Sequence, residues 1–145
     1  MSNTDTRPSI QVTREFKASP EQVFDAWTQV DQLKKWMCPG EIKTGAVSAD
    51  PQVNGDYSIE MIHSDGNSTI TKGKYLVVDR PHKLVMSWQW QMEGSVESKV
   101  TVELKATDNG TELTLTHDLL RDDEAAKQHT HGWEGCLLKL DQQFG

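Results

Sequence analysis

Apolar residues recur every three or four positions near the end of the chain. They are Ala126, Trp133, Leu137, Leu140 and Phe144, with Thr130 at the same spacing and Cys136 widening the row. This spacing puts them on one face of a helix with 3.6 residues per turn. The acidic run at 122–124 suits the positive end of a helix dipole. The pattern therefore predicts one long amphipathic helix over 121–144, roughly 23 residues and ~35 Å in length.

One strand and two short helices are predicted near the start of the chain. Apolar and polar residues alternate over 10–16, which is typical of a strand. At 19–22 a serine, a proline and a glutamine have the types and spacing of a capping box with proline in the first turn. A second short helix is expected to be capped by Asp31 and to end at the Pro-Gly pair of 39–40.

Between Glu41 and His117 the apolar period changes to two, which predicts six further strands. Turn residues separate them, for example Asn54-Gly55 and Asp108-Asn109-Gly110. The row expected to face the helix is Tyr57, Ile59, Met61, Met86, Trp88, Val102, Leu113 and Leu115. Alternation does not assign the inward face of the strand at 70–78. Consecutive strands with short turns imply an antiparallel meander, and a twisted sheet of this length curls.

The predicted fold class is therefore α+β, of the helix-grip type. A curved antiparallel sheet of about six to seven strands wraps around the long C-terminal helix, and two short helices follow the first strand. Residues 10–145 are expected to form a single domain after a flexible tail at 1–9. A curled sheet closed by a helix commonly leaves a cavity between the two, and such cavities are the usual sites for small ligands.

Composition narrows the range of partners. The 145 residues carry a net charge of −7 with a pI near 5.1, which argues against nucleic acid or an anionic membrane surface as a partner. No apolar run approaches the ~20 residues of a membrane span, and the polar start is not a signal peptide. Cys38 and Cys136 form no paired motif, so Cys136 is expected to be a buried thiol and the protein to be cytoplasmic.

No motif for a metal, a cofactor or a nucleophile is present in the sequence. HExxH, P-loop, GxSxG and Rossmann glycine patterns are all missing. His129 and His131 lie two positions apart on the predicted helix, so their side chains diverge and make a poor metal pair. We therefore expect no cofactor and no bound metal.

Several short motifs occur in a specific order over residues 10–144. They are Ala18-Ser19-Pro20, Val23-Phe24, Ala26-Trp27-Thr28, Trp36, Asn54-Gly55-Asp56-Tyr57, Asp79-Arg80-Pro81-His82-Lys83-Leu84, Gly110 to His117, and Gly132-Trp133. Their order and spacing resemble the helix-grip superfamily that includes START lipid-transfer domains and the birch-pollen allergen (SRPBCC). Within it the chain is most similar to the AHSA-type family, named after the activator of heat-shock protein 90 ATPase. Asn54 stands where that family usually has glycine.

The resemblance implies a fold and a cavity but leaves three functions open, because one fold hosts many functions. The leading hypothesis is binding of a small apolar or lipid-like molecule between sheet and helix. A co-chaperone of the stress response, binding a chaperone, is the second. The third is an enzyme of the cyclase or hydratase type, which would need an acid/base pair in the pocket.

The candidate ligand-binding residues follow from the apolar rows and from two polar residues within them. The apolar candidates are Tyr57, Met61, Met86, Trp88, Trp133 and Leu137. Arg14 and His117 are the polar candidates, because each lies on an otherwise apolar face. Arg14 equally suits a rim position or an internal salt bridge, and His117 a hydrogen-bonded structural histidine. Gly132 either lets a ligand approach the helix backbone or allows tight packing.

Overall fold

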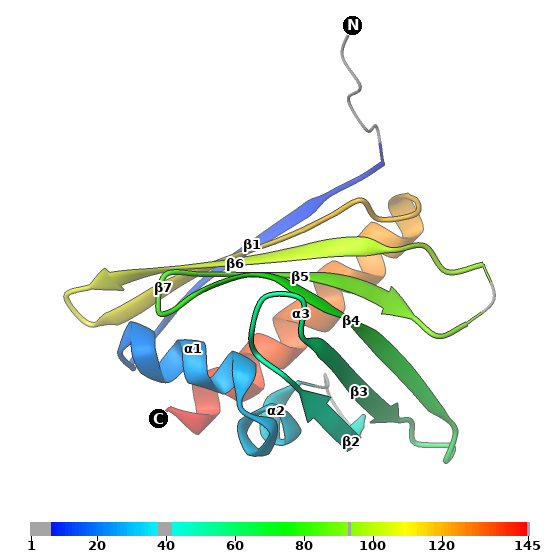
Figure 1. Cartoon of the computed structure of the whole chain (residues 1–145), viewed down its shortest axis with the longest axis horizontal. Helices are drawn as coiled ribbons and strands as arrows, with labels where there is room; N and C mark the ends of the chain where they lie inside the picture. The colour runs from blue at the N-terminus through cyan, green and yellow to red at the C-terminus, as the bar shows by residue number, and fades with distance from the viewer. Residues whose placement is uncertain (1–6, 38–41, 93, 145) are drawn as a thin grey trace, which may run out of the picture.

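The computed structural model describes residues 7–37, 42–92 and 94–144. Its seven strands form one antiparallel sheet in the order β1-β7-β6-β5-β4-β3-β2 (Figure 1). The strands are β1 Ile10–Phe16, β2 Lys43–Ala49, β3 Asp56–Ile62, β4 Ser68–Asp79, β5 Lys83–Trp90, β6 Ser98–Thr107 and β7 Gly110–Asp118. The helices are α1 Pro20–Thr28, α2 Val30–Trp36 and α3 Asp123–Gln143. The predicted α+β helix-grip fold is confirmed.

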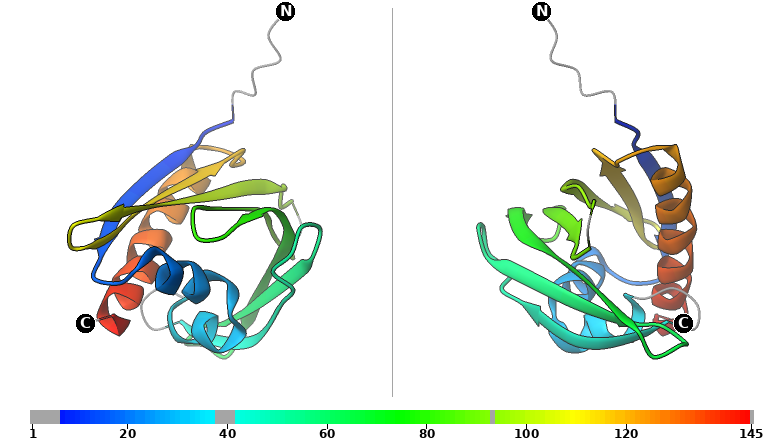
Figure 2. Two further views of the ribbon diagram at one scale, coloured as in Figure 1. Left: turned by 60° about the vertical axis from the view of Figure 1, so that its left-hand side comes forward. Right: turned by 90° about the vertical axis from the view of Figure 1, so that its right-hand side faces the viewer.

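The sheet curls into a half-barrel, as Figure 2 shows, with α3 along its open side and α1 and α2 across one end. The strand register shifts on β2 between Thr44 and Val47, and on β4 between Tyr75 and Val77. Such irregularities bend a strand and increase its twist, so they help the sheet to close around α3. Alternation did not predict which side chains of β4 point inward. In the structure Thr71 and Tyr75 do so, and both are buried.

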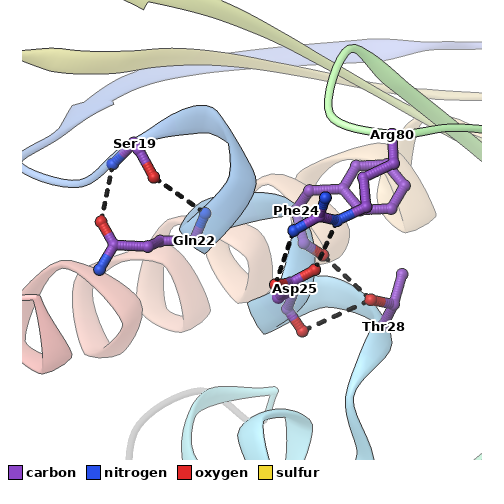
Figure 3. A network of polar contacts seen from close by, with 6 residues as sticks. All are labelled: Ser19, Gln22, Phe24, Asp25, Thr28 and Arg80. Carbon is purple, nitrogen blue, oxygen red and sulfur yellow. Dashed lines mark hydrogen bonds and ion pairs between the residues drawn. The ribbon is translucent and has the colours of Figure 1, made fainter.

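Capping side chains fix the starts of α1 and α3. The Ser19 hydroxyl accepts from the backbone N–H of Gln22, and the Gln22 side chain accepts from the backbone N–H of Ser19, as predicted (Figure 3). The carboxylate of Asp122 caps α3 by accepting from the N–H of Ala125. These contacts satisfy N–H groups that have no partner within the helix.

The predicted cap of the second helix is wrong. α2 begins at Val30, its cap is Gln29, and Asp31 lies inside the first turn. The reason is that Gln29 is extended and serves both as the last cap of α1 and as the first cap of α2. No residue is left between the helices for a separate side-chain cap. The predicted end at 39–40 lies outside the described residues.

The turn between β4 and β5 is tied to α1 by an ion pair. The Arg80 guanidinium donates from Nε and Nη2 to the two carboxylate oxygens of Asp25, at 2.9 and 3.1 Å (Figure 3). Two parallel bonds of this kind fix orientation as well as distance. The contact therefore helps to hold α1 against the end of the half-barrel.

The Asn54-Gly55 turn has a backbone that few residues tolerate. Asn54 has a φ of 69°, a left-handed conformation that glycine adopts freely and asparagine more readily than other side chains. A Cβ at Gly55 would lie 2.0 Å from the carbonyl oxygen of Asp50. The asparagine at position 54 is thus compatible with the turn, whereas position 55 has no room for a side chain.

The five tryptophans of the chain form one continuous row through the core. Ring centroids are 4.7 Å apart for Trp36 and Trp27, 5.5 Å for Trp27 and Trp133, 5.0 Å for Trp133 and Trp88, and 5.8 Å for Trp88 and Trp90. The row runs from the short helices, across α3, to β5. Trp133 is therefore the link between the helices at one end and the sheet at the other.

Candidate functional site

A cavity of about 510 Å³ lies between the sheet and α3. Apolar residues dominate its lining: Met37, Ile42, Met61, Trp88, Trp90, Met92, Val96, Leu120, Ala125, Gly132, Trp133 and Cys136. Its polar lining residues are His63, Thr69, Ser95, Ser98, Arg121, Gln128 and His129. A mostly apolar hollow of this size, with a few polar groups, is typical of a site for a small organic ligand.

Part of the wall on the α3 side is bare backbone. Gly132 lines the cavity, and a Cβ built there would have no contacting atom within 4 Å. Glycine inside a helix costs roughly 1 kcal/mol relative to alanine. Tight packing does not explain this glycine, because the space that a side chain would occupy is empty.

The structure separates the predicted ligand-binding residues into three groups. Three of them line the cavity: Met61, Trp88 and Trp133. Four are buried in the core outside the lining: Tyr57, Met86, His117 and Leu137. The remaining one, Arg14, is partly exposed on β1 and also lies outside the lining.

Arg14 forms an internal ion pair. Its Nη2 donates to Oδ2 of Asp141 at 2.8 Å, which ties β1 to the end of α3. Both side chains are about one-third exposed, at 34% and 36%, so solvent weakens the attraction. The carboxylate of Asp141 thus compensates the positive charge that Arg14 places on an otherwise apolar face.

His117 is fully buried and both of its ring nitrogens are hydrogen-bonded. The indole N–H of Trp133 donates to Nδ1 at 3.0 Å, and Nε2 lies 2.7 Å from the hydroxyl of Ser98. Because an indole can only donate, Nδ1 must be unprotonated, so the neutral ring carries its proton on Nε2. The Ser98 hydroxyl then donates to the backbone carbonyl of Trp88 at 2.8 Å. Both ring nitrogens of His117 and the Ser98 hydroxyl therefore have hydrogen-bond partners.

His129 forms a second pair of the same type. The indole N–H of Trp90 donates to its Nε2 at 3.1 Å, and its Nδ1 lies 2.7 Å from the carbonyl oxygen of Ala125. The His129 ring meets the His117 ring edge to face at 4.7 Å between centroids. Its divergent neighbour His131 is exposed, so the two do not act together.

The environment keeps both histidines neutral. Burial, followed by the nearby His129, lowers the pKa of His117 to about 3. Burial also lowers the pKa of His129, and the hydrogen bond to the Ala125 carbonyl opposes that shift. A neutral ring with both nitrogens engaged has no free site for proton transfer. The geometry of His117 is that of a structural histidine joining α3 to β6 and β7.

Sequence reasoning missed the pairing of His129 with Trp90 and most of the cavity lining on α3. A signal for it was available, since Ala125, His129, Gly132 and Cys136 recur at steps of three and four. They form a second row beside the apolar row, and all four line the cavity. Cys136 is buried, as expected, and its Sγ donates to the backbone carbonyl of Met37, whereas Cys38 lies outside the described residues.

Across 7–37, 42–92 and 94–144, no three His, Cys, Asp or Glu side chains are grouped so as to hold a metal ion. Within that part of the chain, no helix has the length and apolar character needed to cross a membrane.

The sequence profile of one family covers most of the chain. The family is described as Activator of Hsp90 ATPase homolog 1-like protein, and its profile matches residues 17–145. The chain belongs to this family. The assignment agrees with the motif order from Ala18 to Trp133 and with the helix-grip fold. No curated protein matches the chain in sequence.

Solved structures of similar proteins share the fold of this chain. The AHSA1 protein of Silicibacter pomeroyi is 26% identical with a TM-score of 0.85, over 94% of this chain and 96% of that one. A protein of Chromobacterium violaceum is 22% identical with a TM-score of 0.88, again over 94% and 96%. An AHSA1-like protein of Aeromonas hydrophila is 23% identical with a TM-score of 0.77, over 93% and 90%.

Proposed function

We propose that this protein binds a small apolar or lipid-like molecule in the cavity between the sheet and α3. The observation that carries the proposal is the cavity of about 510 Å³ with its largely apolar lining. Its volume falls within the range of ~300–1,000 Å³ that is usual for small-molecule sites. The binding mode is enclosure, driven by the removal of apolar ligand surface from water.

The lining suits ligands that are flat or flexible. Trp88, Trp90 and Trp133 offer aromatic faces, on which a planar ring can stack. Met37 and Met61 have unbranched side chains that adapt to irregular shapes. Fatty acids, long-chain alcohols, flavonoids and polyketide-like aromatics are therefore suitable compounds for a first screen.

The first test is a thermal-shift screen read together with tryptophan emission. A ligand that binds only the folded state stabilises it by ~2.7 kcal/mol at about 100 times its dissociation constant. In a domain of this size ~1 kcal/mol corresponds to roughly 2–4 °C, so we expect a shift of several degrees. Three of the five tryptophans line the cavity, so the emission spectrum should change over the same concentration range.

Gly132→Phe tests whether the ligand occupies this cavity. The new ring would extend into the empty space beside α3, so we expect the affinity for a confirmed ligand to fall by about tenfold or more. Gly132→Ala is the matched control, because it changes the same position by one methyl group and adds no ring to the cavity. Alanine should raise stability by up to ~1 kcal/mol and change affinity little. Equal affinity for Gly132→Phe and the original protein would contradict the cavity as the binding site.

The family description supports a second candidate, a co-chaperone that binds heat-shock protein 90. A pull-down with the purified chaperone distinguishes it from ligand binding. If no apolar compound changed the melting temperature while the chaperone bound, the co-chaperone function would replace the one proposed here.

The enzymatic alternative has less support. An enzyme would need an acid/base pair in the pocket, and neither of the two polar candidates, Arg14 and His117, lines the cavity. Arg14 is engaged by Asp141, and both ring nitrogens of His117 are occupied. A reaction would have to rely on other residues of the lining.

A further inference from the structure

A second hollow lies beside the apolar cavity and has the opposite character. It is an open depression of about 700 Å³ lined by Lys34, Lys35, Ile42, Lys43, Thr44, Ser64 and Lys139. Four of the fifteen basic residues in a chain of net charge −7 thus converge on one place. No carboxylate is among the described residues that line it. Overall the protein repels anions, whereas this depression attracts them.

The lysines of this depression are not used by the ion pairs of the fold. In the described part of the chain, the pairs at salt-bridge distance use Arg14, Lys74, Arg80, Lys99 and Arg121 as cations. None of the depression's four lysines is among them. Like charges brought together without an opposite charge repel one another, so an anion placed among them would be stabilised.

The depression and the cavity meet along a shared wall. Ile42 lines both hollows, and the consecutive residues His63 and Ser64 line one each. On α3, Cys136 lines the cavity and Lys139 lines the depression. Residues three apart on a helix are neighbours on its surface. The two hollows are therefore adjacent.

Lys139 marks the boundary between the two hollows. Its ammonium group donates to the backbone carbonyl of Ile42 at 3.5 Å, in a part-buried contact. Lys34, Lys35 and Lys43 are exposed around it. A positive charge is thus held where an apolar chain leaving the cavity would reach the depression.

We propose that these lysines form an anion subsite for the acidic head group of an amphipathic ligand, whose apolar part occupies the cavity. This inference rests on the proposed function and narrows it from apolar molecules to amphiphiles with a carboxylate or phosphate head. Lysine ammonium groups bind either head group as point charges, without the paired geometry that arginine imposes. The subsite therefore selects a negatively charged head group. Its preference between carboxylate and phosphate depends on how many charges the head group carries.

The test compares three probes with one alkyl chain and different heads: dodecanol, dodecanoate and dodecyl phosphate. Isothermal titration with the original protein should give about tenfold tighter binding for the two anions than for the alcohol. The difference should shrink as salt is added, since the lysines are largely exposed. Tighter binding of the phosphate than of the carboxylate would assign the site to phosphorylated amphiphiles, and the reverse order to fatty acids.

Lys35→Gln combined with Lys139→Gln should remove most of the preference for the anions and leave dodecanol affinity unchanged. Lys105→Gln, which changes an exposed lysine of β6 outside both hollows, is the charge-matched control and should leave the preference intact.

Equal binding of all three probes by every variant would overturn the anion subsite while leaving the apolar cavity in place. No binding of any probe would instead overturn the proposed function, and the subsite with it. Lysine-dependent binding to phosphatidylserine vesicles, without discrimination among the soluble probes, would assign the lysines to a membrane surface and also overturn the subsite.

Discussion

Replacing Trp133 with alanine is expected to lower the free energy of unfolding by about 3–5 kcal/mol. Trp133 is 3% exposed and packs between Trp27 and Trp88, so its loss leaves a large void in the core. It also removes the only indole donor to Nδ1 of His117 within the described structure. The melting temperature should fall by roughly 6–20 °C, measured by circular dichroism or calorimetry.

Two variants separate the contributions to this loss. Trp133→Phe keeps an aromatic ring but leaves Nδ1 of His117 without a donor, so we expect an intermediate loss of about 1–3 kcal/mol. Glu134→Ala, at the neighbouring exposed position, should stay within ~0.5 kcal/mol of the original protein. A loss below ~1 kcal/mol for Trp133→Ala would contradict the central packing role of this residue.

Local patterns were sufficient to predict most of the fold. The bounds of β1 match the strand predicted at 10–16, because apolar and polar residues alternate there. α3 was predicted within two residues at each end, since its apolar row at helical spacing is long. The error at Asp31 arose where one extended residue, Gln29, separates two helices. Aspartate is common at helix caps, but the presence of Asp31 does not show how many residues connect the two helices.

The position of the cavity was harder to predict. Alternation shows which side chains of a strand point inward, but it does not show which of them pack in the core and which line an empty space. Tyr57 and Met61 share one face of β3, yet only Met61 lines the cavity. Met86 and Trp88 differ in the same way on β5. α1 and α2 cross one end of the half-barrel (Figure 2), and that arrangement belongs to the tertiary structure.

The two indole–imidazole pairs were likewise beyond local rules. Trp133 and His117 are 16 residues apart, and Trp90 and His129 are 39 apart. Each pair joins α3 to a strand, so it exists only once the helix has packed on the sheet. The sequence could place His117 on an apolar face, which predicted that it needs a partner. It could not identify that partner.

Acid should destabilise the protein in a range where most carboxylates are still ionised. The unfolded chain protonates its histidines near pH 6.5, whereas the pKa of folded His117 is lowered to about 3. Between these values the unfolded state binds more protons, so stability is complete above pH 6.5 and is lost as the pH falls. For His117 alone the loss should reach about 2 kcal/mol at pH 5, equivalent to roughly 4–8 °C in melting temperature. The lowered pKa of His129 adds to the loss in the same direction.

Denaturant unfolding from pH 8 to pH 5 measures this dependence, and single variants assign it. His117→Gln removes the titrating ring, so the slope of stability against pH should fall even though the variant is less stable throughout. His129→Gln should lower the slope as well. His131→Gln, at an exposed position of α3, is the control variant. Backbone N–H groups lower the pKa values of Asp65 and Asp122, so both stay ionised over this range. An unchanged slope in His117→Gln would mean that His117 already protonates freely in the folded state, and the neutral hydrogen-bonded chain from Trp133 to Ser98 would be wrong.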